Sequence, residues 1–189
     1  MLTPEEKREL LRIAREAIAA ALQGKSQRRG STPSGGLASP SGAFVTLRLG
    51  HELRGCIGYI ESAEPVADVV AEVAVRAAFE DPRFPPVTPA EFRKISLEVS
   101  VLSPMRRVGD ISEIEVGVHG LVIERGGRRG LLLPQVAVEF GWDRMEFLAN
   151  VCRKAGLPRE AWMGPGAALY VFSAELAAEE DVLIGPHHS

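Results

Sequence analysis

Residues Leu53–Tyr59, reading LRGCIGY, carry the pattern on which the predicted fold and site depend. Side chains in a strand alternate between its two faces, so Arg54, Cys56 and Gly58 share one face of the strand expected here. Glycine inside a strand often marks a close approach by a ligand or by backbone, and Gly58 is expected to leave a gap beside the thiol. A nearby guanidinium favours the thiolate over the thiol. The stretch therefore predicts a strand that forms the wall of a binding or reactive site.

The surrounding residues predict an α+β fold. Ala43–Leu49 and Glu52–Ile60 flank Gly50-His51, and Val116–Arg125 and Arg128–Leu133 flank Gly126-Gly127, so both pairs are typical of β-hairpins. Further strands are predicted at Ile95–Leu102 and Ala168–Ala177. The first predicted helix begins at the Thr3 capping box and ends at Gly24, and the second runs from Pro65 to Glu80. Shorter helices are predicted over Pro134–Phe140 and Asp143–Ala155. Because strands occur in hairpins with helices between them, we expect a mainly antiparallel sheet with packed helices.

Length and local composition predict one domain over residues 1–189 with two irregular segments. Residues 24–42 are rich in Ser, Gly, Pro and Arg, which predicts a mobile loop, either a surface connection or a lid. Residues 179–189 are expected to form a flexible C-terminal tail. The prolines in Asp81–Pro86 predict a stiff, extended turn instead.

Composition narrows the classes of function. The formal net charge is −3, so the overall charge does not favour nucleic acid, although Lys25–Arg29 and Arg125–Arg129 are local basic clusters. The two cysteines are too few and too widely spaced for a disulfide framework or a zinc site, and we expect no metal and no cofactor. The N-terminus does not resemble a signal peptide and no apolar run reaches membrane-spanning length, so we expect a cytoplasmic protein that does not enter a membrane.

Cys56 is open to three interpretations. It is a small buried hydrophobic residue, or a nucleophile with His119 as its base, or part of a surface that binds a ligand without reacting. His119 is the best of the four histidines for the base because it lies between glycines at the start of a predicted strand. Cys152, by contrast, falls on the apolar stripe of its predicted helix and is expected to be a core residue.

Arg54 needs an anionic partner if it is buried, because a guanidinium stays charged in a protein. Glu98 and Asp81 are the candidates, and the interaction is either a structural ion pair or the recognition of an anionic ligand. Asp81 and Arg83 also have the spacing to lock the proline turn through side-chain-to-backbone hydrogen bonds.

The chain resembles the AMMECR-one family, named from a chromosomal region linked to Alport syndrome, midface hypoplasia and elliptocytosis. Leu53–Gly58, reading LRGCIG, looks like the signature hexapeptide of that family, and Asp81–Val87, reading DPRFPPV, matches a second family segment. In chain order, the other matching segments are Gly42–Thr46, Glu98–Ser103, Gly117–Leu121, Gly130–Val136, Trp142 and Lys154–Leu157.

The resemblance implies an α+β fold with a larger and a smaller lobe and a cleft between them near the hexapeptide. It also implies the role of protein A in the AmmeMemoRadiSam set, with a Memo-like protein and a radical S-adenosylmethionine protein as partners in a modification pathway. The family has no firmly established activity. The residues expected to bind a ligand are Arg54, Gly55, Gly58, Asp81, Arg83 and Gln135.

Three functions follow from these observations. The first is a binding or scaffold module that works with those two partners. The second is a cysteine-dependent enzyme in which Cys56 reacts, Arg54 orients an anionic substrate and His119 is the base. The third is a regulator that contacts nucleic acid through the two basic clusters.

Overall fold

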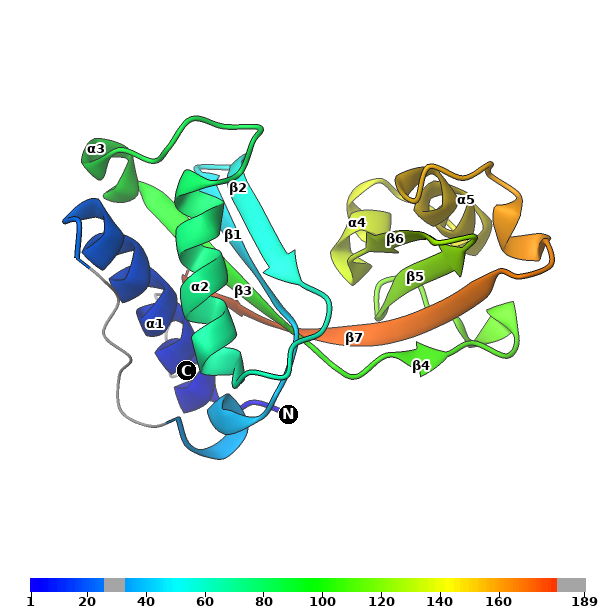
Figure 1. Cartoon of the computed structure of the whole chain (residues 1–189), viewed down its shortest axis with the longest axis horizontal. Helices are drawn as coiled ribbons and strands as arrows, with labels where there is room; N and C mark the ends of the chain where they lie inside the picture. The colour runs from blue at the N-terminus through cyan, green and yellow to red at the C-terminus, as the bar shows by residue number, and fades with distance from the viewer. Residues whose placement is uncertain (26–32, 180–189) are drawn as a thin grey trace, which may run out of the picture. The chain divides into compact units, whose positions relative to one another are not determined.

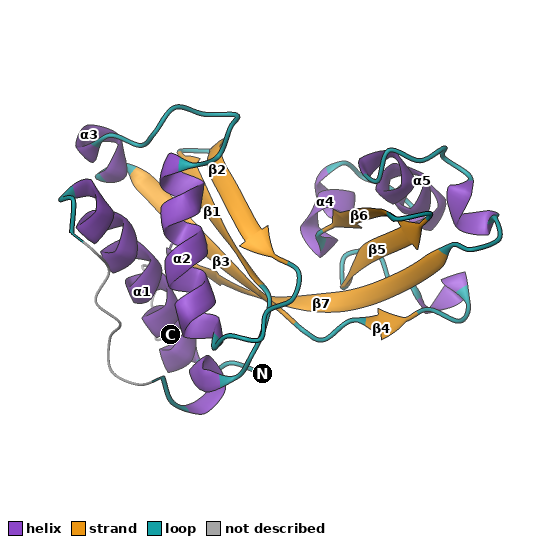
Figure 2. Cartoon of the chain, viewed as in Figure 1, coloured by secondary structure: helices purple, strands orange, loops and turns teal. Residues whose placement is uncertain are grey.

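The computed structural model describes residues 1–25 and 33–179, and these residues form an α+β fold of two compact units (Figures 1 and 2). Unit 1 comprises Met1–Leu102 and Glu175–Ser189, and unit 2 comprises Ser103–Ala174. The described residues contain five α-helices and a seven-stranded sheet whose hydrogen-bonded order is β2-β1-β3-β7-β5-β6, with β4 paired to β7. The predicted fold class is confirmed.

Unit 1 is a sheet with helices packed on one of its faces. Its sheet contains β1 (Ala43–Leu49), β2 (Glu52–Tyr59), β3 (Ile95–Leu102) and the end of β7 (Ala168–Ala178). Its α-helices are α1 (Pro4–Leu22), α2 (Val66–Phe79) and the single turn α3 (Pro89–Phe92). β1 pairs antiparallel with both β2 and β3, which leaves β2 at the edge of the sheet.

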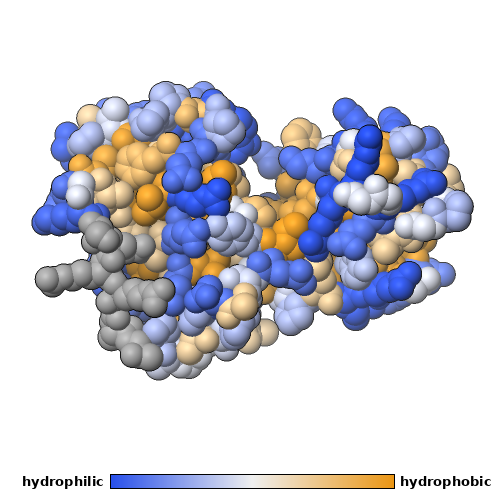
Figure 3. Space-filling model, viewed as in Figure 1, coloured by the Kyte–Doolittle hydropathy of each residue, from blue (hydrophilic) through white to orange (hydrophobic). Residues whose placement is uncertain are grey.

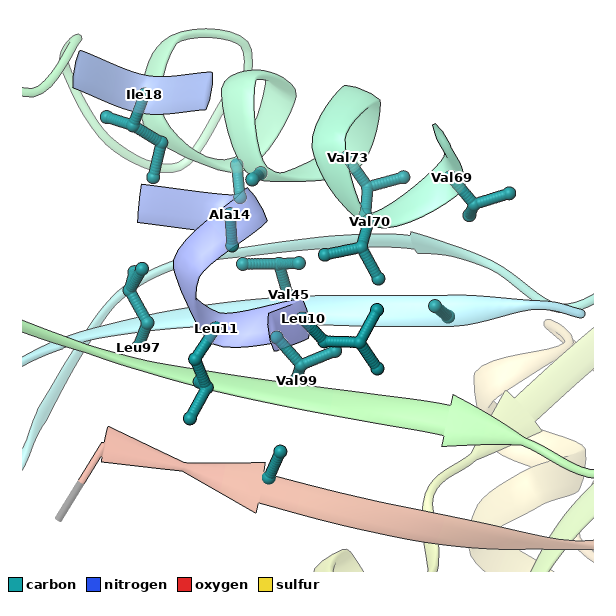
Figure 4. Packing of buried hydrophobic residues seen from close by; sticks show 14 of the residues in the cluster. Leu10, Leu11, Ala14, Ile18, Val45, Val69, Val70, Val73, Leu97 and Val99 are labelled. Atoms are coloured by element: carbon teal, nitrogen blue, oxygen red, sulfur yellow. The ribbon is translucent and has the colours of Figure 1, made fainter. Parts of the chain in front are cut away.

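The core of unit 1 lies between the sheet and the helices α1 and α2 (Figure 4). β1 and β3 alternate between buried and less buried side chains, so every second side chain points to the helices. The fully buried side chains include Leu10, Ala14 and Ile18 from α1, Val70 and Val73 from α2, and Val45, Leu47, Leu97 and Val99 from the strands. The other face of β1, β2 and β3 is therefore the face that these helices do not cover.

The start of α1 follows directly from the sequence. Thr3 accepts a hydrogen bond from the Glu6 amide, and Glu6 accepts one from the Thr3 amide. Pro4 occupies the first turn, where a missing N–H costs nothing. The predicted capping box is confirmed.

Unit 2 packs two helices against a smaller sheet. Its strands are β4 (Arg106–Arg107), β5 (His119–Arg125), β6 (Arg128–Leu132) and most of β7, and its helices are α4 (Pro134–Glu139) and α5 (Arg144–Lys154). The buried side chains of α5, among them Phe147, Val151 and Cys152, pack in one cluster with Leu121 and Ile123 of β5. Cys152 is fully buried, as its place on the apolar stripe predicted.

One predicted strand and one predicted loop have different limits in the structure. The strand expected from Val116 begins at His119, because the His119 amide donates to the Glu115 carbonyl and closes a turn in which Gly117 has φ +89°. Within the loop expected over residues 24–42, Gly35–Ala38 form a 3-10 turn whose Leu37 is buried. The rest of that prediction over residues 26–32, and the tail from residue 180, lie outside the described residues. Neither α3 nor β4 was predicted.

Gly55 allows α2 to approach β2 closely. A Cβ atom at this position would overlap the carbonyl oxygen of Ala77, which belongs to the backbone of α2. The absence of a side chain thus serves helix–sheet packing on the face where Gly55 lies. A backbone carbonyl cannot turn aside as a flexible side chain can.

We expect Gly55→Ala to lower the free energy of unfolding by about 1–3 kcal/mol, because the added methyl group forces β2 and α2 apart. Urea denaturation measures this loss. Gly109→Ala is the matched control, since a Cβ atom there would meet only the end of the Glu113 side chain. Equal midpoints for Gly55→Ala and the unmodified chain would contradict the packing role.

Candidate functional site

Six of the predicted site residues, Arg54, Gly55, Cys56, Gly58, Asp81 and Arg83, lie in unit 1, on β2 and on the loop after α2. β2 carries Arg54 and Cys56, and β1 places Thr46 directly opposite Cys56 in the antiparallel register. The loop that begins at Asp81 runs beside β2, as its hydrogen bonds to Arg54 and Cys56 show. Because β2 is an edge strand, this loop supplies partners to a strand edge that would otherwise be open.

The Cys56 thiol is half-buried and shares its face with Thr46. The Thr46 hydroxyl donates a hydrogen bond of 3.3 Å to Cys56 Sγ. Burial raises the pKa of the thiol, and this effect outweighs the opposing effects of the Thr46 hydroxyl and the Arg83 guanidinium. The thiol form is therefore favoured at neutral pH, which is opposite to what the neighbouring arginine led us to expect.

The space expected beside the thiol at Gly58 is filled. Phe44 is the cross-strand partner of Gly58, and a Cβ atom at Gly58 would overlap the Phe44 ring. Gly58 therefore accommodates an aromatic ring of the same sheet.

Arg54 is 7% exposed and its charge is paired within the unit. Its Nε donates to Glu91 Oε1 at 3.1 Å, and its Nη2 donates to the Pro85 carbonyl at 2.8 Å. Its guanidinium lies 5.7 Å from the centre of the Phe84 ring. Nη1 is buried and has no hydrogen-bond partner among the described residues. Arg54 thus fixes the loop and α3 against the edge strand.

The partner of Arg54 is Glu91, whereas the sequence suggested Glu98 or Asp81. Glu98 lies on β3, which β1 separates from β2, and it pairs with Arg48 of β1 at 2.8 Å. Glu91 is also the acidic member of a capping box that Thr88 begins at α3. The Thr-Pro-Ala-Glu signal was present in the sequence at Thr88–Glu91, and it would have located both α3 and this carboxylate.

Asp81 joins the loop to β2. Its side chain is 2% exposed, and it accepts hydrogen bonds from the Cys56 amide at 3.0 Å and from the Arg83 amide at 3.1 Å. The Arg83 guanidinium donates two more, at 3.0 and 2.7 Å. These bonds, above all those from the Arg83 guanidinium, hold the pKa of Asp81 well below its ordinary value. The prediction that Asp81 and Arg83 lock the turn is confirmed.

His119 and Gln135 belong to unit 2. The His119 side chain is half-buried at the start of β5, and its Nδ1 accepts a hydrogen bond of 3.1 Å from the Glu115 amide. Gln135 is exposed in the first turn of α4. The pairing of Cys56 with His119 and the ligand contact of Gln135 stay predictions.

Two further properties concern ligands and membranes. Within residues 1–25 and 33–179, no group of three or more His, Cys, Asp and Glu side chains is arranged to hold a metal ion. No helix in these same ranges is both long enough and apolar enough to span a bilayer.

We expect Cys56 to be alkylated by iodoacetamide more slowly than a free cysteine at pH 7.5, because its raised pKa leaves little thiolate. Mass spectrometry of the Cys56 peptide measures the rate between pH 6 and 10, and the midpoint should lie above about 8.5. The protein unfolded in urea is the control and should show the ordinary midpoint. A midpoint below about 8.5 in the folded protein would contradict the burial effect.

We expect Asp81→Asn to lower the free energy of unfolding at pH 7 by about 1–3 kcal/mol, because the buried acceptor loses its charge. The folded-state pKa of Asp81 is depressed, so its contribution is present above the ordinary pKa of about 3.9 and is lost as the pH falls through the folded value. Urea denaturation should therefore show a difference that shrinks below about pH 4. Asp68→Asn on α2 removes the same charge and is the control. A difference independent of pH would contradict the role of the carboxylate charge.

The comparisons with known proteins agree with the structure. The AMMECR1 family model matches residues 11–177. A protein of Methanothermobacter thermautotrophicus is 47% identical over 95% of this chain and 97% of its own length, and one of Methanopyrus kandleri is 44% identical over 95% and 91%. The crystal structure of an uncharacterized protein from Pyrococcus horikoshii has a TM-score of 0.83 and 40% identity, and the match covers 88% of each chain. The chain belongs to the AMMECR1 family.

Proposed function

We propose that the chain is a non-catalytic binding module that presents the open face of unit 1 to a protein partner. The open face is the side of β1, β2 and β3 opposite to α1 and α2; its side chains include Phe44, Thr46, Arg48, Cys56 and Glu98. The observation that carries this proposal is that Arg48, Arg54 and Arg83 each pair with a carboxylate, while burial raises the pKa of the Cys56 thiol.

Paired charges favour binding over catalysis here. A reactive thiol needs nearby cations that remain free to stabilise the thiolate or an anionic substrate. The three arginines instead bind Glu98, Glu91 and Asp81. Their bonds hold β1, β2, β3 and the loop in one arrangement, which reduces the ordering cost when a partner binds.

The cysteine-dependent enzyme has less support for the same reason. The pKa of Cys56 is displaced in the direction that disfavours the nucleophile, and the Thr46 hydroxyl already donates to its sulfur. The geometry of the site fits a binding surface of fixed shape better than it fits a covalent reaction of the thiol.

The nucleic-acid regulator also has less support. In the cluster Arg125–Arg129, the Arg125 guanidinium donates to the Ala161 carbonyl at 3.0 Å and that of Arg128 donates to the Gly156 carbonyl. Arg129 pairs with Glu124 at 3.1 Å. These side chains are fixed within unit 2, whereas phosphate contacts need cations that can reach the ligand.

The resemblance in sequence supplies the partners that we propose. They are a Memo-like protein and a radical S-adenosylmethionine protein, and the open face would contact one of them. A sheet face of fixed geometry with a half-buried thiol suits recognition of a protein surface, because shape and hydrogen bonds decide the fit there.

We expect Thr46→Arg to weaken binding to one of these two partners at least about tenfold, because a long charged side chain then stands in the centre of the open face. Isothermal titration calorimetry with each purified partner measures the affinity. Ala63→Arg, in the exposed segment before α2, is the matched control and should bind as the unmodified chain does. Cys56→Ser should also retain binding, because the thiol does not react.

Equal affinities for Thr46→Arg and Ala63→Arg would remove the open face as the interface. Loss of binding on Cys56→Ser, with thermal stability unchanged, would instead favour a covalent role for the thiol.

A further inference from the structure

Unit 2 exposes a group of apolar side chains around α4. We call Val118, Val138, Phe140 and Met145 the α4 patch; they are 48%, 62%, 64% and 51% exposed. They are four of the five large apolar side chains that are exposed in unit 2, all of whose residues are described, and the fifth is Met163. Scattered single residues of this kind need no explanation, but a gathering of them marks an interaction site.

The four side chains come from segments that contact one another. A Cβ atom at Gly117 would lie 3.2 Å from Val138 Cγ2, so α4 borders the turn that carries Val118. The Phe140 ring stacks on Trp142 with 5.1 Å between ring centres, and the Trp142 amide donates to the Ala137 carbonyl at 2.8 Å. This pair joins the end of α4 to the start of α5, where Met145 lies.

Acidic residues lie close in sequence to the residues of the α4 patch. Glu139 lies between Val138 and Phe140, and Glu146 directly follows Met145. Glu115 lies three residues before Val118, and Asp143 lies two before Met145; all four carboxylates are exposed. The one arginine among these residues, Arg144, is directed at the backbone, since its Nε donates to the Ile114 carbonyl at 2.9 Å. Figure 3 shows apolar surface over α4 with hydrophilic side chains beside it. The residues close to the patch in sequence therefore carry four carboxylates and one guanidinium, which is a net negative charge.

We propose that the α4 patch is a docking surface for a basic amphipathic helix of a protein partner. Such a helix presents an apolar stripe flanked by lysine and arginine, which complements apolar side chains with acidic ones around them. Apolar contact supplies the affinity, and charge complementarity supplies the orientation and a dependence on salt. This surface lies in unit 2 and does not depend on the open face of unit 1.

The acidic surroundings argue against two other occupants. A second copy of the chain would bring the same four carboxylates to the interface, so like charges would face one another. An anionic membrane would be repelled in the same way. A positively charged partner is the one that both the apolar and the acidic side chains fit.

The test uses the full chain and a fluorescent helical peptide of about 18 residues with leucine on one face and lysine on the other. Fluorescence anisotropy should show binding that weakens as salt is raised from about 0.05 to 0.5 M. The same peptide with glutamate in place of each lysine should bind at least about tenfold more weakly. Equal binding of the two peptides would overturn the proposal.

Variants locate the binding on the chain. Phe140→Ser and Glu139→Lys should each reduce the affinity for the lysine peptide at least about fivefold. Met163→Ser and Glu160→Lys are the matched controls, because each replaces an exposed apolar or acidic side chain of unit 2 outside the α4 patch. An equal loss in the controls would show non-specific attraction and overturn the proposal.

Sedimentation of the unmodified chain tests the remaining alternative. If the proposal is correct, the unmodified chain does not self-associate through Phe140. A dimer that disappears on Phe140→Ser would assign the patch to a second copy and overturn the proposal. Both sets of results are independent of Thr46→Arg, so failure here leaves the proposed function of unit 1 standing.

Discussion

The Asp81 carboxylate is the constraint on which the candidate site depends. It is almost completely buried, and it binds the Cys56 amide of the edge strand together with the amide and guanidinium of Arg83. A buried carboxylate is tolerated only when donors satisfy its oxygens, so the loop must stay against β2 for Asp81 to stay charged. Arg54 reinforces the same arrangement through the Pro85 carbonyl and Glu91. The stiffness that the prolines predicted is completed by these contacts.

Local sequence signals predicted most helices and strands because capping or turn residues mark where each of them begins or ends. The Thr3 capping box, the hairpin turn at Gly50-His51 and the strand at Ile95–Leu102 were all predicted from residues close together in the chain, and all appear in the structure. The single turn α3 was missed although Thr88 and Glu91 form the same kind of capping box as Thr3 and Glu6. The predicted extended turn ends at Pro86, and no element was predicted between it and the strand that begins at Ile95.

The site was harder to predict because its interactions join distant residues. The sequence pattern placed Cys56 and Arg54 in β2, but the strand order decides which carboxylate each arginine reaches. In the order β2-β1-β3, Glu98 of β3 lies next to β1 and pairs with Arg48. The glycines show the same limit. A sequence indicates that something approaches Gly55 and Gly58, and only the fold shows that the approaching groups are the α2 backbone and the Phe44 ring. Tertiary packing therefore accounts for a pattern that also fits a ligand site.

The two units differ in the side chains that they leave exposed or unpaired. This difference supports our proposal that the protein binds partners. In unit 1, carboxylates neutralise the arginines around Cys56 and packing fills the space at the glycines. In unit 2, four apolar side chains around α4 stay exposed, and four exposed carboxylates lie close to them in sequence. A stable fold has no need of such a patch, since exposed apolar surface adds nothing to stability and invites association. The exposed patch of unit 2 and the paired charges of unit 1 support our proposal that the chain has two different binding surfaces.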